Sequence, residues 1–250
     1  MGSTAQSAPP TARWGRPVTA CERWGTGVAG ADPPRSGLAT LQSLQDAQRR
    51  CTRCVDAGYL AASKPVFSGH PGQRILLVGQ APGPVENDCT RPFAGRAGRQ
   101  LMRWFERGGF AGEADVRRRV YMTSMTTCFP GRTPDGRGDR RPSSREVALC
   151  SWWLDAVLSL LTPQLVMPIG SLALARFLPG HRLDDAVGQL FDASGAAVEA
   201  PGEVPAVLPL LLPLPHPSGQ SRWLNDSARA RQLDRALSRL PHLIGWSESG

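Results

Sequence analysis

Four short apolar runs recur along the chain, each bounded by glycine, proline or polar residues. They lie at residues 74–79 (RILLVG), 120–125 (VYMTSM), 165–169 (LVMPI) and 207–214 (VLPLLLPL). Apolar runs of this length with such boundaries are typical of buried β-strands. Two prolines interrupt the fourth run, so it is predicted to be an irregular or edge strand.

Between these runs, the apolar positions follow the spacing of amphipathic helices. The predicted helices cover residues 37–51, 96–108, 144–162, 170–177 and 225–240. Ser143 or Ser144 could cap the third helix, which stops before Pro163, and Asn225 or Asp226 could cap the last.

Strands that alternate with helices predict an α/β fold, because parallel strands are joined by crossover helices that cover both sheet faces. The expected architecture is a three-layer α/β/α sandwich with a central, mostly parallel, four-stranded sheet over residues 37–245. Residues 1–36 are rich in Gly, Pro, Ser, Ala and Arg without periodicity. They are expected to form a disordered or loosely attached N-terminal tail.

The charge of the chain favours a polyanionic partner such as nucleic acid. The formal net charge is +8, and Lys64 is the only lysine, so the basic residues are almost all arginines. The sequence contains no uncharged apolar stretch of membrane-spanning length, and its N-terminus lacks the apolar core of a secretory signal. We therefore expect a cytoplasmic protein without a membrane partner.

Three unusual loops follow predicted strands: GQAPG after the first, TTCFPG after the second and PHPSG after the fourth. In parallel sheets, ligands bind outside the carboxyl ends of the strands, so these loops are predicted to form one active site. Neither of the common phosphate-binding motifs, GxxxxGK[ST] and GxGxxG, is present.

Four cysteines have a spacing that suits a metal or a cluster. Cys51 and Cys54 form a C-x-x-C pair at a helix end, Cys128 follows a strand, and Cys150 lies in the next helix. Spacing alone leaves tetrahedral zinc and a [4Fe–4S] cluster equally supported, with buried free thiols a third alternative. A redox pair is disfavoured because this C-x-x-C does not open a helix after a strand. Cys21 and Cys89 are not included in the set.

Taken together, four motifs resemble the iron–sulfur branches of the uracil-DNA glycosylase superfamily, families 4 and 5. The run GQAPGPVENDCTRPFAGRAG is similar to the family 4 loop GEAPGxxEDxxGRPFVGxAG, and it is followed in order by YMTSMTTCFPGRTP, IGSLAL and His216-Pro217-Ser218. The resemblance covers roughly residues 45–240. It implies a DNA-repair enzyme that flips uracil out of DNA and hydrolyses the N-glycosidic bond, with other deaminated bases as further candidate substrates.

The resemblance also implies a cofactor and a DNA contact. It assigns Cys51, Cys54, Cys128 and Cys150 to a [4Fe–4S] cluster, and thus decides against zinc. The cluster is expected to brace the arginine-rich segment 129–145 against the DNA backbone. On composition alone, that segment would more often be an ordinary solvated loop.

By the same resemblance, Phe93 stacks on the flipped base, although an ordinary core aromatic is the alternative. His216 and backbone N–H groups of the turn from Gly79 to Gly83 are expected to hydrogen-bond the base oxygen. The remaining implied DNA contacts are Ser218, the helix start at Gly95 and Arg96, and Arg222, the expected plug for the space that the base leaves.

Two positions depart from family 4. Gln80 stands where the family has an acid that activates or positions water, and an amide can hold water but cannot act as a general base. Glu86 is the reserve candidate, with Asp88 behind it. Ser124 stands where family 4 has an asparagine that reads uracil, so hypoxanthine or xanthine could also be substrates, as in family 5.

The sequence therefore predicts a monomeric, nucleoid-associated DNA-repair glycosylase that acts on uracil first. One alternative is a damaged-DNA-binding protein that keeps the pocket and cluster but has little turnover because of Gln80. Another is a nucleotide-binding α/β protein with structural zinc.

Overall fold

A computed structural model describes residues 39–200, 207–218 and 222–249. The predicted tail and the predicted helix start near Gly37 lie outside these ranges. The described helices are α1 (Leu41–Arg49), α2 (Arg53–Asp56), α3 (Pro84–Cys89), α4 (Arg96–Arg107), α5 (Glu113–Arg119), α6 (Ser144–Leu161), α7 (Gly170–Phe177), α8 (Leu183–Ala186), η2 (Arg222–Asn225) and α9 (Ser227–Ser249). The strands are β1 (Ile75–Gly79), β2 (Val120–Ser124), β3 (Leu165–Pro168), β4 (Leu190–Phe191), β5 (Ala197–Val198) and β6 (Leu210–Leu211).

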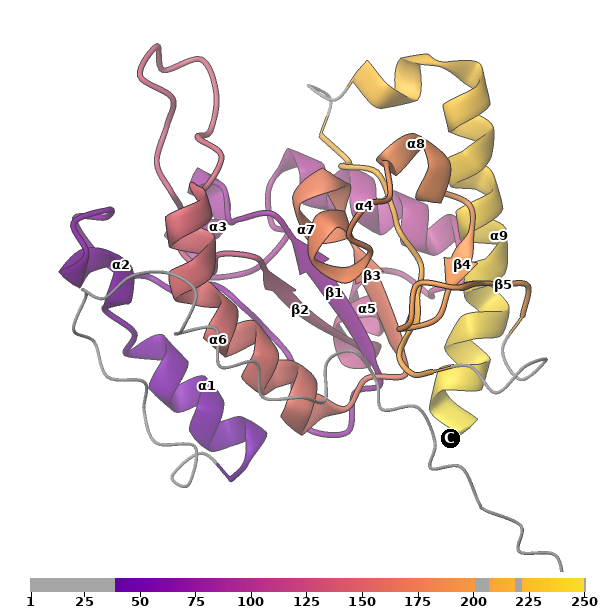
Figure 1. Cartoon of the computed structure of the whole chain (residues 1–250), viewed down its shortest axis with the longest axis horizontal. Coiled ribbons are helices and arrows are strands. Elements are labelled where there is room, and N and C mark those ends of the chain that lie inside the picture. The colour runs from indigo at the N-terminus through magenta and orange to yellow at the C-terminus, as the bar shows by residue number, and fades with distance from the viewer. Residues whose placement is uncertain (1–38, 201–206, 219–221, 250) are drawn as a thin grey trace, which may run out of the picture.

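The strands form one sheet in the order β2-β1-β3-β6-β4-β5 (Figure 1). Strands β2, β1, β3 and β6 run parallel, whereas β4 pairs antiparallel with both β6 and β5. The described sheet thus has six strands, and the predicted number of four was wrong. The two added strands contain only two residues each, which is too short for a hydrophobic pattern to reveal.

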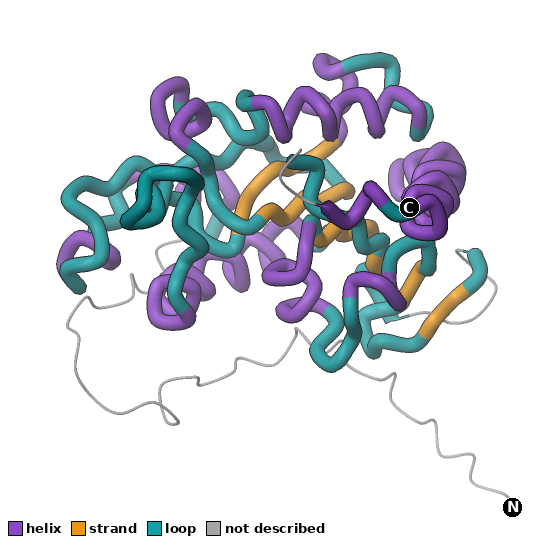
Figure 2. The backbone as a smooth tube through the Cα atoms, turned by 90° about the horizontal axis from the view of Figure 1, so that it is seen from above, coloured by secondary structure: helices purple, strands orange, loops and turns teal. Residues whose placement is uncertain are grey.

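Alternate strand residues point to opposite faces of the sheet, and each face has its own helix layer (Figure 2). Ile75 and Leu77 of β1 pack in a cluster with residues of α4, α5 and α9. Leu76 and Val78 pack in a second cluster with residues of α1, α6 and α7. The predicted three-layer α/β/α sandwich is confirmed.

The fourth predicted strand is shorter than its apolar run. Only Leu210–Leu211 are strand, because Pro209 and Pro213 have no N–H to donate to the sheet. Beyond β6, Leu212 and Leu214 still donate backbone hydrogen bonds to Val166 and Pro168, at 2.9 and 3.0 Å. This extension carries the following His-Pro-Ser segment to the same sheet edge as the ends of the central strands.

The helix caps follow the sequence signals. Ser143 Oγ accepts a hydrogen bond from Glu146 N at 3.3 Å, and Asp226 Oδ1 accepts one from Ala228 N at 2.7 Å. Helix α9 nevertheless continues past its predicted end, with Pro241 inside it, to Ser249. Leu243 and Ile244 are buried beyond the proline, so tertiary packing maintains a helix that a proline alone would interrupt.

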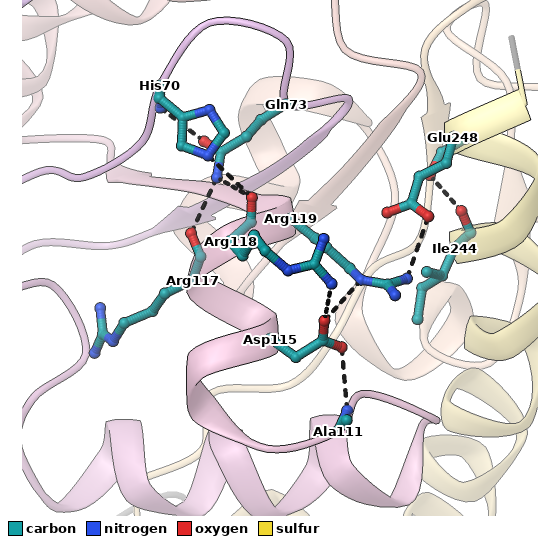
Figure 3. Close-up of polar contacts among 10 residues, drawn as sticks. His70, Gln73, Ala111, Asp115, Arg117, Arg118, Arg119, Ile244 and Glu248 are labelled. Atoms are coloured by element: carbon teal, nitrogen blue, oxygen red, sulfur yellow. Dashed lines mark hydrogen bonds and ion pairs between the residues drawn. The ribbon is translucent and has the colours of Figure 1, made fainter.

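An ion-pair network lies at the amino-terminal end of β2 (Figure 3). Asp115 accepts from Arg118 and Arg119, the latter at 2.9 Å, and Arg119 also contacts Glu248 of α9 at 3.3 Å. At this end of the sheet, the arginines are thus engaged by acids of the protein itself. Within the described ranges, no helix has both the length and the apolar composition needed to cross a membrane.

Candidate functional site

The carboxyl ends of the central strands lie together and define the candidate site. Gly79 at the end of β1 is the register partner of Ser124 at the end of β2, and Met125 N donates to Gly79 O at 2.9 Å. At the end of β3, Gly170 N donates to Leu214 O, also at 2.9 Å. The structure therefore brings the GQAPG, TTCFPG and PHPSG loops to one edge, as predicted.

Phe93 lies directly against the first strand end. A Cβ atom on Gly79 would be 3.1 Å from Phe93 Cζ and 3.5 Å from Ser124 Oγ, so glycine at this position lets the Phe93 ring approach the strand end closely. Phe93 has a positive φ of 54° and a half-buried ring. Gly79, Phe93 and Ser124 thus form one wall, in which an aromatic face and a hydroxyl lie side by side.

The backbone of Phe93 is held by the start of α4. A Cβ atom on Gly98 would lie 1.8 Å from Phe93 O, so the helix can approach the loop only because residue 98 has no side chain. The sequence signal for this contact is the GRAG run, residues 95–98, at the start of the helix. The sequence predicts a DNA contact for this run and does not reveal its packing on Phe93.

His216 follows the extension of β6 and is half-buried. Its Nδ1 accepts a hydrogen bond from Ser218 N at 3.3 Å, and burial lowers its pKa below the ordinary value of 6.5. A neutral imidazole that accepts on Nδ1 carries its proton on Nε2. His216 is therefore a neutral hydrogen-bond donor at physiological pH.

The two candidate acid positions have different environments. Gln80 is half-buried, and its backbone oxygen accepts from Thr126 N at 3.3 Å. Glu86 lies in the first turn of α3, and its two carboxylate oxygens accept from Gly83 N at 3.1 Å and from Gly95 N at 2.8 Å. Glu86 thus links the two ends of the loop that contains Phe93, because it accepts hydrogen bonds from the backbone N–H groups of Gly83 and Gly95.

The predicted DNA-contacting residues are distributed around the same edge. Gly95 is the N-cap of α4 and its N–H already donates to Glu86, whereas Arg96, the first residue of α4, is exposed. Ser218 is half-buried next to His216. Arg222 opens η2. Residues 219–221, which include the rest of the predicted plug, lie outside the described ranges.

The segment between β2 and α6 projects above the amino-terminal end of α6 (Figure 1). Arg140 anchors it, because its guanidinium donates two 2.7 Å hydrogen bonds to the carboxylate of Glu146 and also contacts Pro130 O. This pairing with Arg140 is the main reason that the pKa of Glu146 falls to about 2. The other arginines of residues 129–145, at positions 132, 137, 141 and 145, are exposed.

One pocket is lined by all four predicted ligand cysteines, Cys51, Cys54, Cys128 and Cys150. Three of their sulfurs lie close to hydrogen-bonding side chains. Trp153 Nε1 donates to Cys51 Sγ at 3.2 Å, Ser63 Oγ lies 3.6 Å from Cys128 Sγ, and Thr127 Oγ1 lies 3.7 Å from Cys150 Sγ. The sequence did not indicate Trp153 as part of this site.

Burial raises the pKa of Cys54 to about 12 and that of Cys150 to about 11, and neighbouring thiols contribute further in both cases. Such thiols ionise only when a positive group compensates them. The hydroxyl of Thr126, which also lines the pocket, is buried with no hydrogen-bond partner among the described residues. A pocket of this kind suits a bound group that accepts several thiolates.

Within the described part of the chain, no three His, Cys, Asp or Glu side chains are close enough together to hold a single metal ion. Thiolates on one zinc ion lie only ~4 Å apart, given a Zn–S bond of about 2.3 Å. Among the described residues, the four cysteines of the pocket are therefore not arranged as a preformed site for one ion.

A sequence model of the Uracil DNA glycosylase superfamily matches residues 67–240. The chain is also 27% identical over 143 residues to the Type-4 uracil-DNA glycosylase of Thermotoga maritima, with 57% of this chain and 68% of that protein covered. It is 27% identical over 165 residues to the Type-4 uracil-DNA glycosylase of Pyrobaculum aerophilum, with 64% and 78% covered. The matched region contains the strand ends that form the candidate site.

Proposed function

The chain belongs to the uracil-DNA glycosylase superfamily, and on that premise we propose that it excises uracil from DNA by hydrolysing the N-glycosidic bond. The observation that supports this most is the convergence of Gly79, Phe93 and Ser124 at one strand end, with His216 at the neighbouring loop. An aromatic wall and a fixed neutral donor are what a flipped base requires.

The first step is extrusion of the nucleotide, which costs a few kcal/mol of stacking and pairing. Phe93 offsets part of that cost by stacking on the base. Its ring lies against Gly79 at the end of β1 and its backbone lies against Gly98 in α4, so little freedom remains to be lost when the base arrives.

The second step separates charge, since the base leaves as an anion and the sugar becomes cationic. His216 Nε2–H donates to the base oxygen on which negative charge develops. The neutral imidazole stabilises the departing anion by a hydrogen bond and does not transfer its proton to the base. Backbone N–H groups of the turn at Gly79 to Gly83 are proposed as further donors to that oxygen.

Gln80 is proposed to hold the attacking water by accepting and donating hydrogen bonds. Glu86 is not free for this role, because both of its oxygens bind backbone amides. Ser124 has a single hydroxyl, whereas strict selection of uracil would require two hydrogen-bonding groups at this position. Hypoxanthine and xanthine are therefore proposed as secondary substrates.

Cys51, Cys54, Cys128 and Cys150 are proposed to hold a [4Fe–4S] cluster. When bound, such a cluster supplies a covalent crosslink between segments that are far apart in sequence. Here it would join α2, the loop after β2, and α6, from which the arginine-rich segment projects. Iron and acid-labile sulfide at four per chain, lost in Cys54→Ser, would support this assignment.

We also propose that the protein acts as a monomer on DNA in the nucleoid. The proposal is supported by the exposed Arg96 at the start of α4 and by the exposed arginines of the arginine-rich segment. Ser218 and Arg222 are proposed to contact the backbone and to fill the space left by the base.

Excision is tested with cluster-loaded protein on oligonucleotides that each contain one uracil, hypoxanthine or xanthine. We expect abasic sites from uracil DNA first, a loss of about 10²-fold or more in His216→Ala, and wild-type rates in the surface control Gln42→Ala. If the wild type binds these oligonucleotides without cutting them, it is a damage-binding protein. In that case Gln80→Glu should create excision.

A further inference from the structure

We propose that Asp139, in the arginine-rich segment, supplies the catalytic carboxylate that the GQAPG loop lacks. This inference rests on the proposed uracil excision and identifies a further residue of the same site. It gives the segment 129–145 a chemical role in addition to DNA contact.

The geometry that points to Asp139 is its approach to the turn after β1. A Cβ atom on Gly83 would lie 3.3 Å from Asp139 Oδ2 and 2.9 Å from Glu86 Oε2. Gly83 is three residues from Gln80 in the same turn. A carboxylate from a segment more than fifty residues away in sequence thus reaches Gly83, in the same turn as the position where the acid is missing.

The carboxylates of Glu86 and Asp135 are already engaged, and Asp88 lies on the exposed side of α3. Both oxygens of Glu86 accept backbone N–H groups. Asp135, on the same segment as Asp139, accepts from Thr133 Oγ1 at 2.5 Å and from Arg137 N at 3.2 Å. Asp139 has a single polar contact among the described residues, a 4.0 Å ion pair with Arg132. Its oxygens therefore remain available to a water molecule.

The backbone around Asp139 fixes the direction of the side chain. Arg132 and Asp139 form an antiparallel bridge, and Arg140 N donates to Gly131 O at 2.8 Å. Side chains of consecutive residues in extended backbone point to opposite sides. Arg140 points to Glu146 at the start of α6, so Asp139 points the other way, toward Gly83.

The proposed chemistry is hydrolysis with a balanced proton transfer. The C1′–N bond breaks, and its electron pair leaves with the base, whose oxygen receives the hydrogen bond from His216 Nε2–H. The oxygen of water then forms a bond to C1′, and its proton passes to the Asp139 carboxylate. Asp139 returns the proton to solvent or to the departed base anion, which leaves neutral uracil and an abasic sugar.

Before water attacks, the same negative charge stabilises the cationic sugar. An acid in an arginine-rich DNA-binding segment also has a cost, because it repels the phosphate backbone. A purely structural or DNA-binding account therefore predicts that removal of this charge leaves binding intact or tightens it, without slowing the reaction.

The test measures single-turnover uracil excision and DNA affinity separately, with cluster-loaded protein. We expect Asp139→Asn to slow excision by about 10²-fold or more while its Kd for DNA stays the same or falls. Asp139→Glu should retain more activity than the amide, and the matched control Asp135→Asn should stay within about twofold of wild type.

A second variant keeps the test independent of loop folding. Gln80→Glu in the Asp139→Asn background should restore much of the rate, because it returns an acid to the same turn. Wild-type excision by Asp139→Asn, or a parallel loss of rate and binding without rescue, would overturn the inference and leave the proposed function intact. An absence of excision by the wild type would overturn the proposed function and, with it, this role for Asp139.

Discussion

His216 shows how one backbone contact sets the chemistry of a side chain. Ser218 N donates to Nδ1, so the imidazole can donate only through Nε2. Burial lowers the pKa of His216, which keeps the ring neutral over the pH range where most DNA enzymes work. The tautomer and the charge together make His216 a suitable partner for a developing oxyanion.

The pH dependence of excision follows from this arrangement. As pH falls through the lowered pKa, His216 gains a proton on Nδ1 and can no longer accept from Ser218 N. We expect the single-turnover rate to stay level from about pH 8 down to the ordinary value of about 6.5, and to fall only below it. A rate that is already halved near pH 6.5 because His216 becomes protonated there would contradict this expectation.

Residue roles were predicted unevenly from the sequence. Phe93, Ser124 and His216 could be placed because each lies in a short motif at the end of an apolar run. The amide contacts of Glu86 could not, since they join Gly83 and Gly95 across a loop whose path no local pattern specifies. Trp153 escaped notice for the same reason, because its partner Cys51 is 102 residues away.

At the scale of elements, α6 connects the cysteine pocket to the arginine-rich segment. It begins with the Ser143–Glu146 cap, contributes Cys150, and one turn later presents Trp153 to Cys51. The neighbouring Trp152 packs edge-on against Trp153, with ring centroids 4.7 Å apart. The helix thus offers two adjacent indoles, of which Trp153 donates to the sulfur of Cys51, a proposed cluster ligand.

Trp153→Phe should weaken cluster retention, because it removes the N–H donor and keeps most of the packing. We expect loss of the visible iron–sulfur absorption to a chelator to be about 10-fold faster than in wild type. Trp152→Phe is the matched control and should behave as wild type. Equal rates for all three proteins would show that the Trp153 hydrogen bond does not stabilise the cluster.

The start of α4 makes a second testable contact. Gly98→Ala places a methyl group on Phe93 O, so either the helix or the stacking loop must move. We expect a loss of about 1–3 kcal/mol in the free energy of unfolding, together with slower uracil excision. Gly245→Ala in α9, whose Cβ would meet nothing within 4 Å, should be neutral or stabilising by up to about 1 kcal/mol. Unchanged melting in Gly98→Ala would show that the contact is not limiting.

The elements themselves were largely predictable, and the exceptions have physical causes. Three parallel strands and the layered arrangement follow from apolar runs alternating with helices. The fourth run gave only a two-residue strand because of its prolines, and α9 passed through Pro241 because residues on both sides of it are buried. Strands β4 and β5 depend on pairing partners that a single segment does not reveal.

Across the whole molecule, the positive charge is distributed in two ways. At the amino-terminal end of β2, Arg118 and Arg119 contact Asp115 (Figure 3), and Arg117 contacts Glu113. Arg137, in the segment that projects beside the strand ends, is 87% exposed in its side chain and has only a 4.0 Å ion pair. Arg137 is therefore more available to a phosphate than Arg117, Arg118 and Arg119 are.

This distribution predicts which arginines determine the salt dependence of DNA binding. Each phosphate contact contributes about 0.9 to the slope of log K against log salt. The double variant Arg137→Ala/Arg141→Ala should lower the magnitude of that slope by about 2, whereas Arg118→Ala, on the opposite end, should leave it unchanged. A change caused by Arg118→Ala alone would place the DNA elsewhere on the molecule.

The central claim is that this chain hydrolyses the bond between uracil and deoxyribose, and release of free uracil measures it most directly. Cluster-loaded wild-type protein, in excess over a duplex with one deoxyuridine, should release uracil in a single exponential phase. The matched thymidine duplex should release no thymine. Full binding of the deoxyuridine duplex with no uracil released, while a glycosylase control cuts it completely, would contradict the account.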